Sequence, residues 1–461
     1  MKLVLLSGGS GKRLWPLSND ARSKQFLKVL PSDDDMPVSM LQRVVGQLRS
    51  IGMEHDTYVC ASQAQLDMIQ SQVSGASVIV EPLRRDTFPA IALSCTYLAH
   101  LRDARRDEIV IVAPVDQYVD AHFFKTIARL PETLLQSGAD LALLGVEPTQ
   151  PSSQYGYIVP DSTLAVPGSP YAPVASFKEK PSEQVAAALI ADGALWNCGV
   201  FCFRMSFMLD YLRTHGYPDQ YAGMISHFKD MPKKSFDHAV VEGVKSIVVQ
   251  SYSGTWKDLG TWGSLSDELA GPFTGAGTAL DCDGTHVINE LNIPVIAKGL
   301  HNIMVVASPD GILVADKEHC ADIKEVVSTL SDRPMYEERR WGLYRVLDFQ
   351  KLDDAAEVLT KSLEIKAGCN ISYQRHEHRE EVWTIIQGRG ELALDGKVTS
   401  VTAGDVVRVC KGQWHALRAM EKLVLIEVQR GMPLIEEDVE RRFINWDDIV
   451  HHCSALVRLV V

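Results

Sequence analysis

A glycine-rich stretch close to the N-terminus has the residue types that bind phosphate. In SGGSGKR, Gly8, Gly9 and Gly11 precede Lys12 and Arg13. Glycines let backbone N–H groups approach an anion closely, and an arginine adds a bidentate fork. The spacing matches neither the dinucleotide fingerprint G-x-G-x-x-G nor the P-loop pattern G-x-x-x-x-G-K-[ST]. The stretch therefore predicts a phosphate-binding loop of another kind, with a tight strand-to-helix turn as the alternative.

A second group of side chains has the types and spacing of a metal site. GCNISYQRHEHREEVW places Gln374 and His376 two residues apart, on one face of a strand, with Glu381 after a short turn. The later run AGDVVRVCKGQWH ends in His415. The two runs resemble the two-part metal signature of cupin barrels, and a Gln, His, Glu, His set with an open coordination position suits Zn²⁺ or a similar ion. Histidines satisfied within a core are the alternative.

The elements that must hold the glycine-rich stretch can be read from the hydrophobic period. Five short apolar runs look like buried strands, at residues 3–6, 58–61, 78–80, 109–113 and 141–146. Between them lie segments of helical period, among them SMLQRVVGQLRSI, PAIALSCTYLAHL and HFFKTIARLPETLLQ. Strands that alternate with helices predict a parallel sheet covered on both faces, with ligands beyond the carboxyl ends of the strands. The glycines follow the first run, so we expect them at that edge.

The pattern changes near Gly271. Short apolar runs separated by Gly, Asn and Asp turns predict a small all-β segment, and the charged helical stretch CADIKEVVSTLSDRPMYEERR follows as a connector. From Trp341 onward short β-like runs resume, with turns at AGCN, QGRG, LDGK and AGD, roughly ten residues apart as in a sandwich or barrel. We therefore expect three domains, at residues 1–270, 271–335 and 336–461.

Composition limits the class of protein. The chain has 461 residues and a formal net charge of -13, with 46% hydrophobic and 23% charged residues, as in soluble globular proteins. Binding nucleic acid non-specifically needs runs of Lys and Arg, which the sequence lacks. No apolar run approaches about 18 residues, so we expect no membrane association and a cytoplasmic protein. The nine cysteines lack zinc-type paired spacing and are expected to be mostly buried.

Five motifs, in order, resemble those of the mannose-1-phosphate guanylyltransferases. They are GGSGKRLWPLS, KQFL at 24–27, FKEKP at 177–181, WNCGVF at 196–201 and WKDLGTW at 256–262. The resemblance covers essentially the whole chain, and the C-terminal part is similar to the type II phosphomannose isomerase module. It implies an α/β fold: a Rossmann-like nucleotidyltransferase domain with a mostly parallel sheet, a short module like a left-handed β-helix, and a C-terminal cupin β-barrel.

The resemblance also implies which residues carry out nucleotidyl transfer. A sugar 1-phosphate oxygen would attack the α-phosphorus of GTP and pyrophosphate would leave, so catalysis is mostly alignment and charge neutralisation. Asp116 and Asp258 would hold Mg²⁺, although an aspartate after a strand is as often a turn or cap residue. The other implied roles are triphosphate contact by Arg13 and Lys24, nucleotide binding by Gly8, Gly9, Gly11, Arg85 and Asp86, sugar-phosphate contact by Lys180, and sugar binding by Gly156, Glu179 and Asn197.

Three positions in the first domain depart from the family pattern. Lys12 stands where the family usually has Thr, and Asp86 where it usually has Asn. Gln117 follows the first metal aspartate in place of a usual His. These changes bear on the choice of base and sugar rather than on the type of reaction. For FKEKP, a solvated strand end is the alternative to a sugar site.

The barrel implies a second reaction, in which a proton moves between C1 and C2 of a hexose 6-phosphate. The metal would polarise the carbonyl and hold the enediolate. His378 is a candidate base, and Arg379 is a further candidate, with a surface ion pair to Glu380 as its alternative. Glu377, Glu380 and Val382 replace residues expected in the family run. The isomerase activity therefore stays open.

Three functions are compatible with the sequence. The first is synthesis of GDP-mannose from GTP and mannose 1-phosphate, with or without isomerase activity. The second is nucleotidyl transfer to a different sugar 1-phosphate, with a non-catalytic cupin domain. The third is a non-catalytic sensor of sugar nucleotides. The partners are small molecules in each case, and the edges of the β module and barrel offer surfaces for a homo-oligomer.

Overall fold

The chain forms two compact units, which are described separately. The computed structural model describes residues 1–9, 12–19, 22–32, 36–161, 163–164, 166, 168–330, 333–352 and 356–459. The first unit comprises Met1–Leu14, Ser23–Gly271 and Lys317–Ala321, and the second comprises Trp15–Arg22, Pro272–Asp316 and Asp322–Val461. The chain therefore leaves the first unit directly after Leu14 and returns to it at Ser23.

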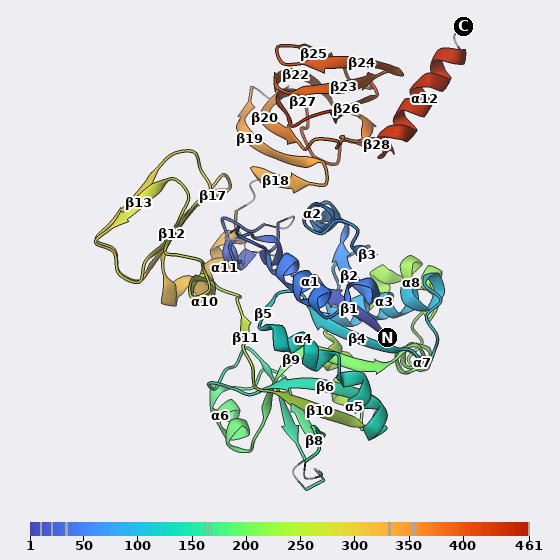
Figure 1. Ribbon diagram of the computed structural model, residues 1–461, viewed down its shortest axis with the longest axis vertical. Helices are drawn as coiled ribbons and strands as arrows, with labels where there is room; N and C mark the ends of the chain where they lie inside the picture. The colour runs from blue at the N-terminus through green and yellow to red at the C-terminus, as the bar shows by residue number, and fades with distance from the viewer. Residues whose placement is uncertain are drawn as a thin grey trace. The chain divides into compact units, whose positions relative to one another are not determined.

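A nine-stranded sheet forms the centre of the first unit (Figure 1). Its strands, in order across the sheet, are β3 (Ser77–Glu81), β2 (Thr57–Ser62), β1 (Lys2–Leu6), β4 (Ile109–Pro114), β9 (Leu195–Arg204), β6 (Leu141–Val146), β10 (Ile247–Tyr252), β8 (Tyr171–Lys178) and β7 (Gly156–Pro160). The five predicted strand runs all lie within β1, β2, β3, β4 and β6, so those predictions are confirmed. A separate two-stranded sheet pairs β5 (Gln117–Val119) with β11 (Trp256–Asp258).

Alternate residues of the central strands face the two sides of the sheet. In β1, Leu3 and Leu5 belong to one buried cluster, and Val4 and Leu6 belong to the other. The first cluster includes residues of α1 (Met40–Ser50), α2 (Leu66–Gln72), α4 (Ala121–Ile127), α5 (Leu130–Ser137) and α6 (Glu183–Ala191). The second includes residues of α3 (Thr87–Leu101), α7 (Met205–Thr214), α8 (Tyr221–Ser226) and α9 (Phe236–Ala239). Helices thus cover both faces, as the apolar strand runs predict.

The second half of the sheet is less parallel than predicted. β1 to β4 run parallel to one another, but β9 runs antiparallel to both β4 and β6, and β7 and β8 form an antiparallel edge. A strand buried on both faces is continuously apolar in either direction, so composition cannot predict the direction of β9. The segment HFFKTIARLPETLLQ forms two helices, α4 and α5, because Pro131 lies in the first turn of α5 and interrupts a continuous helix.

A short β module opens the main part of the second unit. β12 (Phe273–Thr274), β14 (His286–Asn289) and β16 (Ile303–Ser308) are parallel neighbours, and β13 (Gly277–Leu280) pairs in parallel with β15 (Val295–Lys298). β17 (Gly311–Asp316) adds an antiparallel strand. The chain passes repeatedly through these two parallel ladders. The connector that follows contains α11 (Ile323–Val327).

The segment Trp15–Arg22 packs within this second unit. The Arg22 guanidinium forms a bidentate pair with Glu290, with N···O distances of 2.7 and 2.9 Å. Ser308 Oγ donates to the carbonyl of Pro16 at 2.8 Å. Arg22 is 6% exposed, so Glu290 compensates a buried charge.

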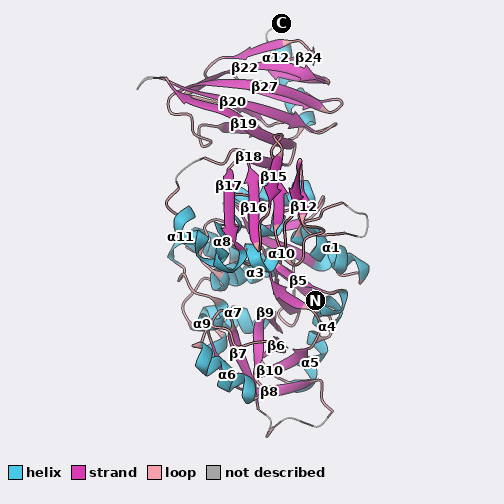
Figure 2. Cartoon of the chain, turned by 90° about the vertical axis from the view of Figure 1, so that its left-hand side faces the viewer, coloured by secondary structure: helices cyan, strands magenta, loops and turns pink. Residues whose placement is uncertain are grey.

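Two antiparallel sheets form the C-terminal part of the second unit (Figure 2). One contains β18 (Tyr336–Arg339), β19 (Gly342–Lys351), β20 (Glu357–Ile365), β27 (Leu423–Gly431), β22 (Arg379–Gln387) and β25 (Val406–Val409). The other contains β24 (Lys397–Thr402), β23 (Arg389–Leu394), β26 (His415–Ala419), β21 (Tyr373–Arg375) and β28 (Glu440–Phe443), and α12 (Trp446–Leu459) follows. β20 alternates buried and half-buried residues along its length, which is typical of a barrel wall. These strands form the expected cupin-like domain.

Two further expectations concern the chain as a whole. In the part that the structure describes, no helix is both long and apolar enough to cross a membrane. All nine cysteines are free, and most are buried as predicted, but Cys282 and Cys369 are half-buried and Cys410 is exposed.

Candidate active site and metal centre

A short two-stranded sheet brings two predicted aspartates together in the first unit. Asp258, at the end of β11, lies opposite Gln117 of β5, and Asp116 immediately precedes β5. The Lys24 ammonium joins the two carboxylates, because its Nζ lies 2.9 Å from Asp116 Oδ2 and 2.8 Å from Asp258 Oδ1. Three residues that are far apart in the sequence therefore meet at one point.

The charges at this point stabilise one another. Burial alone would lower the pKa of Lys24, but Asp116 and Asp258 raise it above its ordinary value. Lys24 therefore carries a full positive charge between the two carboxylates. Mg²⁺ prefers a small number of carboxylate oxygens and keeps several waters for exchange with phosphate oxygens. The donor set of Asp116 and Asp258 fits such an ion.

Arg13 reaches the same region from the segment after the glycine-rich stretch. A Cβ built on Gly260 would lie 3.3 Å from Asp258 Oδ2 and 3.5 Å from an Arg13 guanidinium nitrogen. Asp258 and Arg13 therefore both lie close to Gly260. A guanidinium there adds a second positive charge for an anionic ligand.

The remaining predicted nucleotide residues are placed in different ways. Gly8 and Gly9 follow β1 at its carboxyl end, and among the described residues, apart from the chain neighbours, no atom lies within 4 Å of a Cβ built on either. Gly9 has a φ of 119°, which favours glycine. Gly11 lies outside the described residues. Arg85 donates to a backbone carbonyl at 2.9 Å, and the Asp86 side chain caps α3.

A cavity of about 230 Å³ adjoins the two aspartates. It is lined by Pro114, Asp116, Gln117, Gln154, Tyr155, Gly156, Glu179, Lys180, Asn197, Cys198, Gly199, Asp237, Trp256 and Asp258. Gly156 on β7 lies opposite Asn197 on β9, and a Cβ on Gly156 would overlap Glu179 Oε2. Glycine at this position therefore lets the Glu179 carboxylate lie against the sheet. Lys180 Nζ lies 3.3 Å from Glu179 Oε1. The cavity joins the predicted metal and sugar residues.

Asp237 is a residue of this cavity that the sequence analysis missed. It lies in α9, and Asn197 Nδ2 donates to its Oδ1 at 2.7 Å. Burial and then the charge of Glu179 raise the pKa of Asp237 to about 6. In the sequence it stands in KSFDHAVVEG, outside the five motifs, where an aspartate near a helix start suggests a capping or first-turn role. The packing of α9 against β9 is what reveals it.

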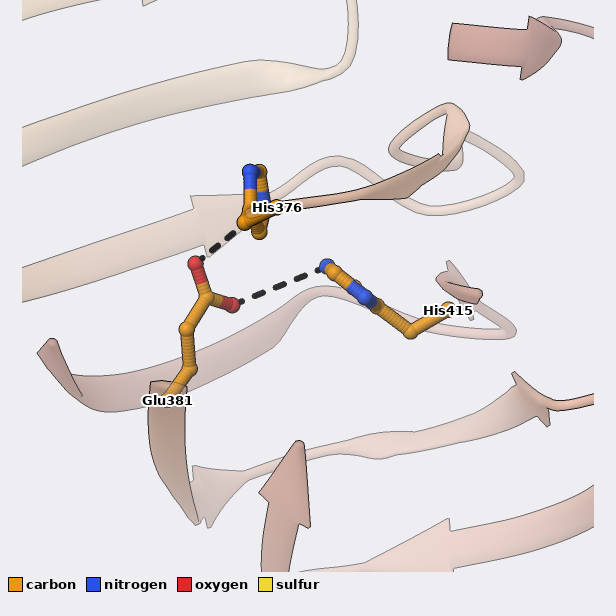
Figure 3. A group of neighbouring side chains, drawn as sticks. All are labelled: His376, Glu381 and His415. Carbon is orange, nitrogen blue, oxygen red and sulfur yellow. Dashed lines mark ion pairs between the residues drawn. The ribbon is translucent and has the colours of Figure 1, made fainter. Parts of the chain in front are cut away.

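In the second unit, His376, Glu381 and His415 form a buried set (Figure 3). Their ligand atoms all lie within 4.8 Å of one another. His376 Nε2 lies 3.4 Å from Glu381 Oε1, and His415 Nε2 lies 3.7 Å from Glu381 Oε2. The barrel strands produce this arrangement, because Glu381 points inward from β22 and His415 begins β26, opposite Gln374 of β21.

Each histidine of the set is oriented by a backbone carbonyl. His376 Nδ1 bonds to the Asp438 carbonyl at 2.5 Å, and His415 Nδ1 bonds to the Gln413 carbonyl at 3.0 Å. These bonds assign the N–H to Nδ1 and leave Nε2 as an electron-pair donor. Burial lowers the pKa of His376 to about 4 and also lowers that of His415. His415 Nε2 is buried and has no hydrogen-bond partner among the described residues. The set therefore fits a divalent metal ion.

Two other residues predicted for the barrel differ in their position. Gln374 Nε2 lies 3.5 Å from His376 Nε2, so Gln374 borders the set, while its Oε1 accepts from Ser372 Oγ at 2.8 Å. His378 is exposed, whereas the set is buried. The structure therefore brings Gln374 to the metal site but leaves the His378 side chain on the surface.

Arg379 is buried beside the set. Its Nε donates to Glu381 Oε1 at 3.0 Å, because residues two apart on β22 share a face. The alternative of a surface pair with Glu380 is wrong, since Glu380 points outward and accepts from Arg408 at 3.0 Å. Burial would raise the pKa of Glu381, but the surrounding His415 and Arg379 hold it below its ordinary value.

A second buried carboxyl group, which sequence reasoning also missed, lies next to Glu381. Trp383 Nε1 donates to Glu381 Oε2 and to Glu427 Oε1, at 3.1 Å in both cases. Burial and then the charge of Glu381 raise the pKa of Glu427 to about 8. Burial and the neighbouring Glu381 thus both favour the protonated form of Glu427.

Comparisons with known proteins identify both parts of the chain. The family model for nucleotidyl transferase matches residues 2–271, and the model for the mannose-6-phosphate isomerase C-terminal region matches residues 331–443. The alginate biosynthesis protein AlgA of Pseudomonas putida is 31% identical over 95% of this chain and 94% of its own length. The mannose-1-phosphate guanylyltransferase RfbM of Salmonella typhimurium is 30% identical over 95% of this chain and 96% of its own length.

One solved structure extends this similarity to three dimensions. It is described as a mannose-1-phosphate geranyltransferase from Thermus thermophilus, is 26% identical, and aligns with a TM-score of 0.60 over 72% of this chain and 99% of its own. The chain therefore belongs to the nucleotidyl transferase family, among the mannose-1-phosphate guanylyltransferases that carry a C-terminal mannose-6-phosphate isomerase domain.

Proposed function

We propose that this protein transfers a guanylyl group from GTP to mannose 1-phosphate, giving GDP-mannose and pyrophosphate. The observation that carries the proposal is the cavity in which Asp116 and Asp258, joined by Lys24, lie beside Glu179 and Asn197. In this cavity the charged residues around Lys24 suit the phosphates, and the neighbouring Glu179 and Asn197 suit the hydroxyl groups of a sugar. Membership of the guanylyltransferase family supports the same pair of substrates.

The reaction requires alignment and charge neutralisation rather than a covalent intermediate. An oxygen of the sugar phosphate forms a bond to the α-phosphorus of GTP, and the bond to pyrophosphate breaks. In this proposal Arg13 and Lys24 bind the triphosphate, and Lys180 binds the sugar phosphate. Asp116 and Asp258 would hold Mg²⁺, which neutralises phosphate charge when it is bound.

The proposal includes an arrangement of three domains. They are a nucleotidyltransferase domain at residues 1–270, a short left-handed β-helix with its connector at 271–335, and a cupin barrel at 336–461. The parallel ladders of β12, β14 and β16 and of β13 and β15 support the β-helix.

For the barrel we propose a bound divalent metal, Zn²⁺ or a similar ion, held by His376, Glu381 and His415 with Gln374 beside them. The unpartnered Nε2 of His415 supports this ligand set. A second activity, the interconversion of mannose 6-phosphate and fructose 6-phosphate, follows from the same set, since a bound metal polarises a carbonyl. Of the two predicted isomerase residues, Arg379 is the one that lies beside the ligands.

Pyrophosphate release tests the transferase proposal. With GTP, mannose 1-phosphate and Mg²⁺ we expect release together with an equal amount of GDP-mannose. If pyrophosphate is released only with another sugar 1-phosphate, that sugar is the substrate in place of mannose. If no pair of sugar phosphate and nucleotide gives release, the result favours a non-catalytic sensor. Asp258→Asn should abolish release while GTP binding and the melting temperature persist. Asp267→Asn, at an exposed position, is the matched control.

Metal analysis tests the barrel proposal. His415→Ala should lose the bound metal and any interconversion of the hexose 6-phosphates while nucleotidyl transfer continues. His451→Ala, at an exposed position of α12, should change neither. Unchanged metal content in His415→Ala would contradict the ligand set.

A further inference from the structure

The protein engages both ends of the Asn197 side chain. Its Nδ2 donates to Asp237 Oδ1 at 2.7 Å, and its Oδ1 accepts from the Gly199 N–H at 3.1 Å. The hydrogen-bond pattern therefore assigns the orientation of the amide. An amide held in this way orients its neighbours, and it retains one N–H for a ligand.

Asp237 brings a carboxyl group to the same cavity from a third element. Asn197 comes from β9, Glu179 directly follows β8, and Asp237 lies in α9, yet all three line one cavity. The start of α9 is anchored by Ser235, whose Oγ accepts from the His238 N–H at 3.3 Å. The position of Asp237 is therefore fixed by its own helix as well as by Asn197.

Glu179 and Asp237 both line the cavity and contribute two carboxyl groups to its wall, of which Glu179 pairs with Lys180 at 3.3 Å. Burial and the charge of Glu179 raise the pKa of Asp237 to about 6, which reflects their crowding. A ligand fits such a wall if it brings O–H donors and no negative charge at that end. A pyranose ring meets this requirement, because its hydroxyls are neutral donors and its phosphate lies at C1.

We infer that Asp237 is a sugar-binding residue whose carboxyl group accepts a hydrogen bond from a ring hydroxyl of the sugar 1-phosphate, and that Asn197 is the residue that positions it. This inference rests on the proposed function. The family resemblance implied that Asn197 binds the sugar, whereas here the sugar contact is assigned to Asp237. A site built to pair with a hydroxyl rejects an analogue that lacks it, because the buried acceptor is then left unpaired. Asp237 therefore discriminates among sugar 1-phosphates.

A purely structural pair between Asn197 and Asp237 is the competing explanation. It predicts that breaking the pair weakens the fold and affects both substrates alike. Sugar binding predicts an effect that is confined to the sugar substrate. The two explanations therefore separate in steady-state kinetics.

The first experiment removes one charge from the cavity. In Asp237→Asn the amide oxygen still accepts from Asn197, so the amide nitrogen, a donor, replaces the oxygen that faces the sugar. We expect the KM for mannose 1-phosphate to rise about 10- to 100-fold, as for the loss of a hydrogen bond to a charged group, with the KM for GTP and the melting temperature unchanged. Asp230→Asn, at an exposed position, is the matched control. The same kinetics with three mannose 1-phosphates that each lack one ring hydroxyl, at C2, C3 or C4, should identify one analogue that wild type handles poorly and that Asp237→Asn handles no worse than the full sugar.

A second variant exchanges the two side chains. Asn197→Asp with Asp237→Asn keeps a hydrogen bond between the positions, and an aspartate at 197 still accepts from the Gly199 N–H. The amide nitrogen at 237 must then donate to the aspartate at 197, which leaves the amide oxygen, an acceptor, toward the sugar. We therefore expect the KM for mannose 1-phosphate to fall from its value in Asp237→Asn back toward that of wild type.

Three results would overturn the inference. They are an unchanged sugar KM in Asp237→Asn, an equal rise in the KM for GTP, and a sugar KM in the exchanged pair that stays as high as in Asp237→Asn. All three presuppose that wild type releases pyrophosphate with mannose 1-phosphate. Failure of that reaction would instead refute the proposed function itself.

Discussion

Lys24 lies at the point where, in the proposed function, the divalent cation and the triphosphate meet. Its ammonium is 2.9 Å from Asp116 and 2.8 Å from Asp258. The substitution Lys24→Met keeps the length of the side chain and removes its charge. We expect two opposite effects: the protein without nucleotide binds a divalent cation more tightly, and turnover falls.

The magnitude of the first effect follows from Coulomb's law. The three side chains are between 18% and 36% exposed, so the effective dielectric lies below that of bulk water. The repulsion between a divalent cation and an ammonium at a separation of about 4 Å is about 2 kcal/mol in bulk water, so removing the ammonium should raise the affinity by roughly 30-fold or more. The second effect is the loss of a positive group from the phosphates, which costs about 100-fold or more in kcat.

Two measurements check these effects. Mn²⁺ titration followed by electron paramagnetic resonance, without nucleotide, gives the cation affinity, and pyrophosphate release gives turnover. Lys125→Met, which removes an exposed ammonium from α4, is the matched control. Weaker Mn²⁺ binding by Lys24→Met would show that the lysine holds the carboxylates ready for the metal instead of competing with it. Unchanged turnover would show that Lys24 takes no part in the transfer reaction.

Three further substitutions test other contacts. Gly156→Ala places a methyl group against the Glu179 carboxylate, which can turn away, so the KM for mannose 1-phosphate should rise about tenfold with little change in melting temperature; steady-state kinetics check this. Glu290→Gln leaves the buried Arg22 without its counter-charge, so the free energy of unfolding should fall by about 3 kcal/mol in urea denaturation, and a loss close to zero would contradict the pair. Burial raises the pKa of Glu81 from 4.5 to about 7, so its stabilising contribution is complete below pH 4.5 and is lost as the pH rises through 7. This loss amounts to about 3 kcal/mol, and Glu81→Gln should remove it; a variant that loses as much stability as wild type between about pH 5 and pH 8 would contradict this assignment.

Five of the nine strands of the central sheet were predictable because a strand buried on both faces is a short apolar run. The runs at 3–6 and 141–146 coincide with β1 and β6 almost to the residue. Strand direction was not predictable, since the apolar run of β9 is the same whichever way the strand lies between its neighbours. Direction depends on connections and partners that are distant in the sequence.

The residues of the candidate sites also divide into those that the sequence indicated and those that only the packed fold brings together. The motif order linked Asp116, Asp258 and Lys24 in one hypothesis, although no local pattern shows that β5 pairs with β11. Asp237 has no such motif, and its contact with Asn197 joins two elements that only the packed fold brings together. Local periodicity would have sufficed for Arg379, because the two-residue period that groups Gln374 with His376 also places Arg379 with Glu381.

Both candidate metal sites contain a side-chain cation next to the carboxylate that would bind the metal, but they hold it differently. The Lys24 ammonium ends a flexible four-carbon chain, and its carboxylate partners line a cavity with room for substrate, so a metal ion can take its place while the ammonium moves to a phosphate. Arg379 is 6% exposed and is fixed by Glu381 and by the Ile435 carbonyl at 3.2 Å. Moving this guanidinium away would leave its own charge unpaired in a buried place, at a cost of several kcal/mol. A metal in the barrel would therefore bind beside Arg379, and at His376 Nε2 it would compete with Arg379 Nη2, which lies 3.3 Å away. A metal in the first unit would take the place of Lys24, because the lower burial and the flexible chain of Lys24 make that pairing exchangeable.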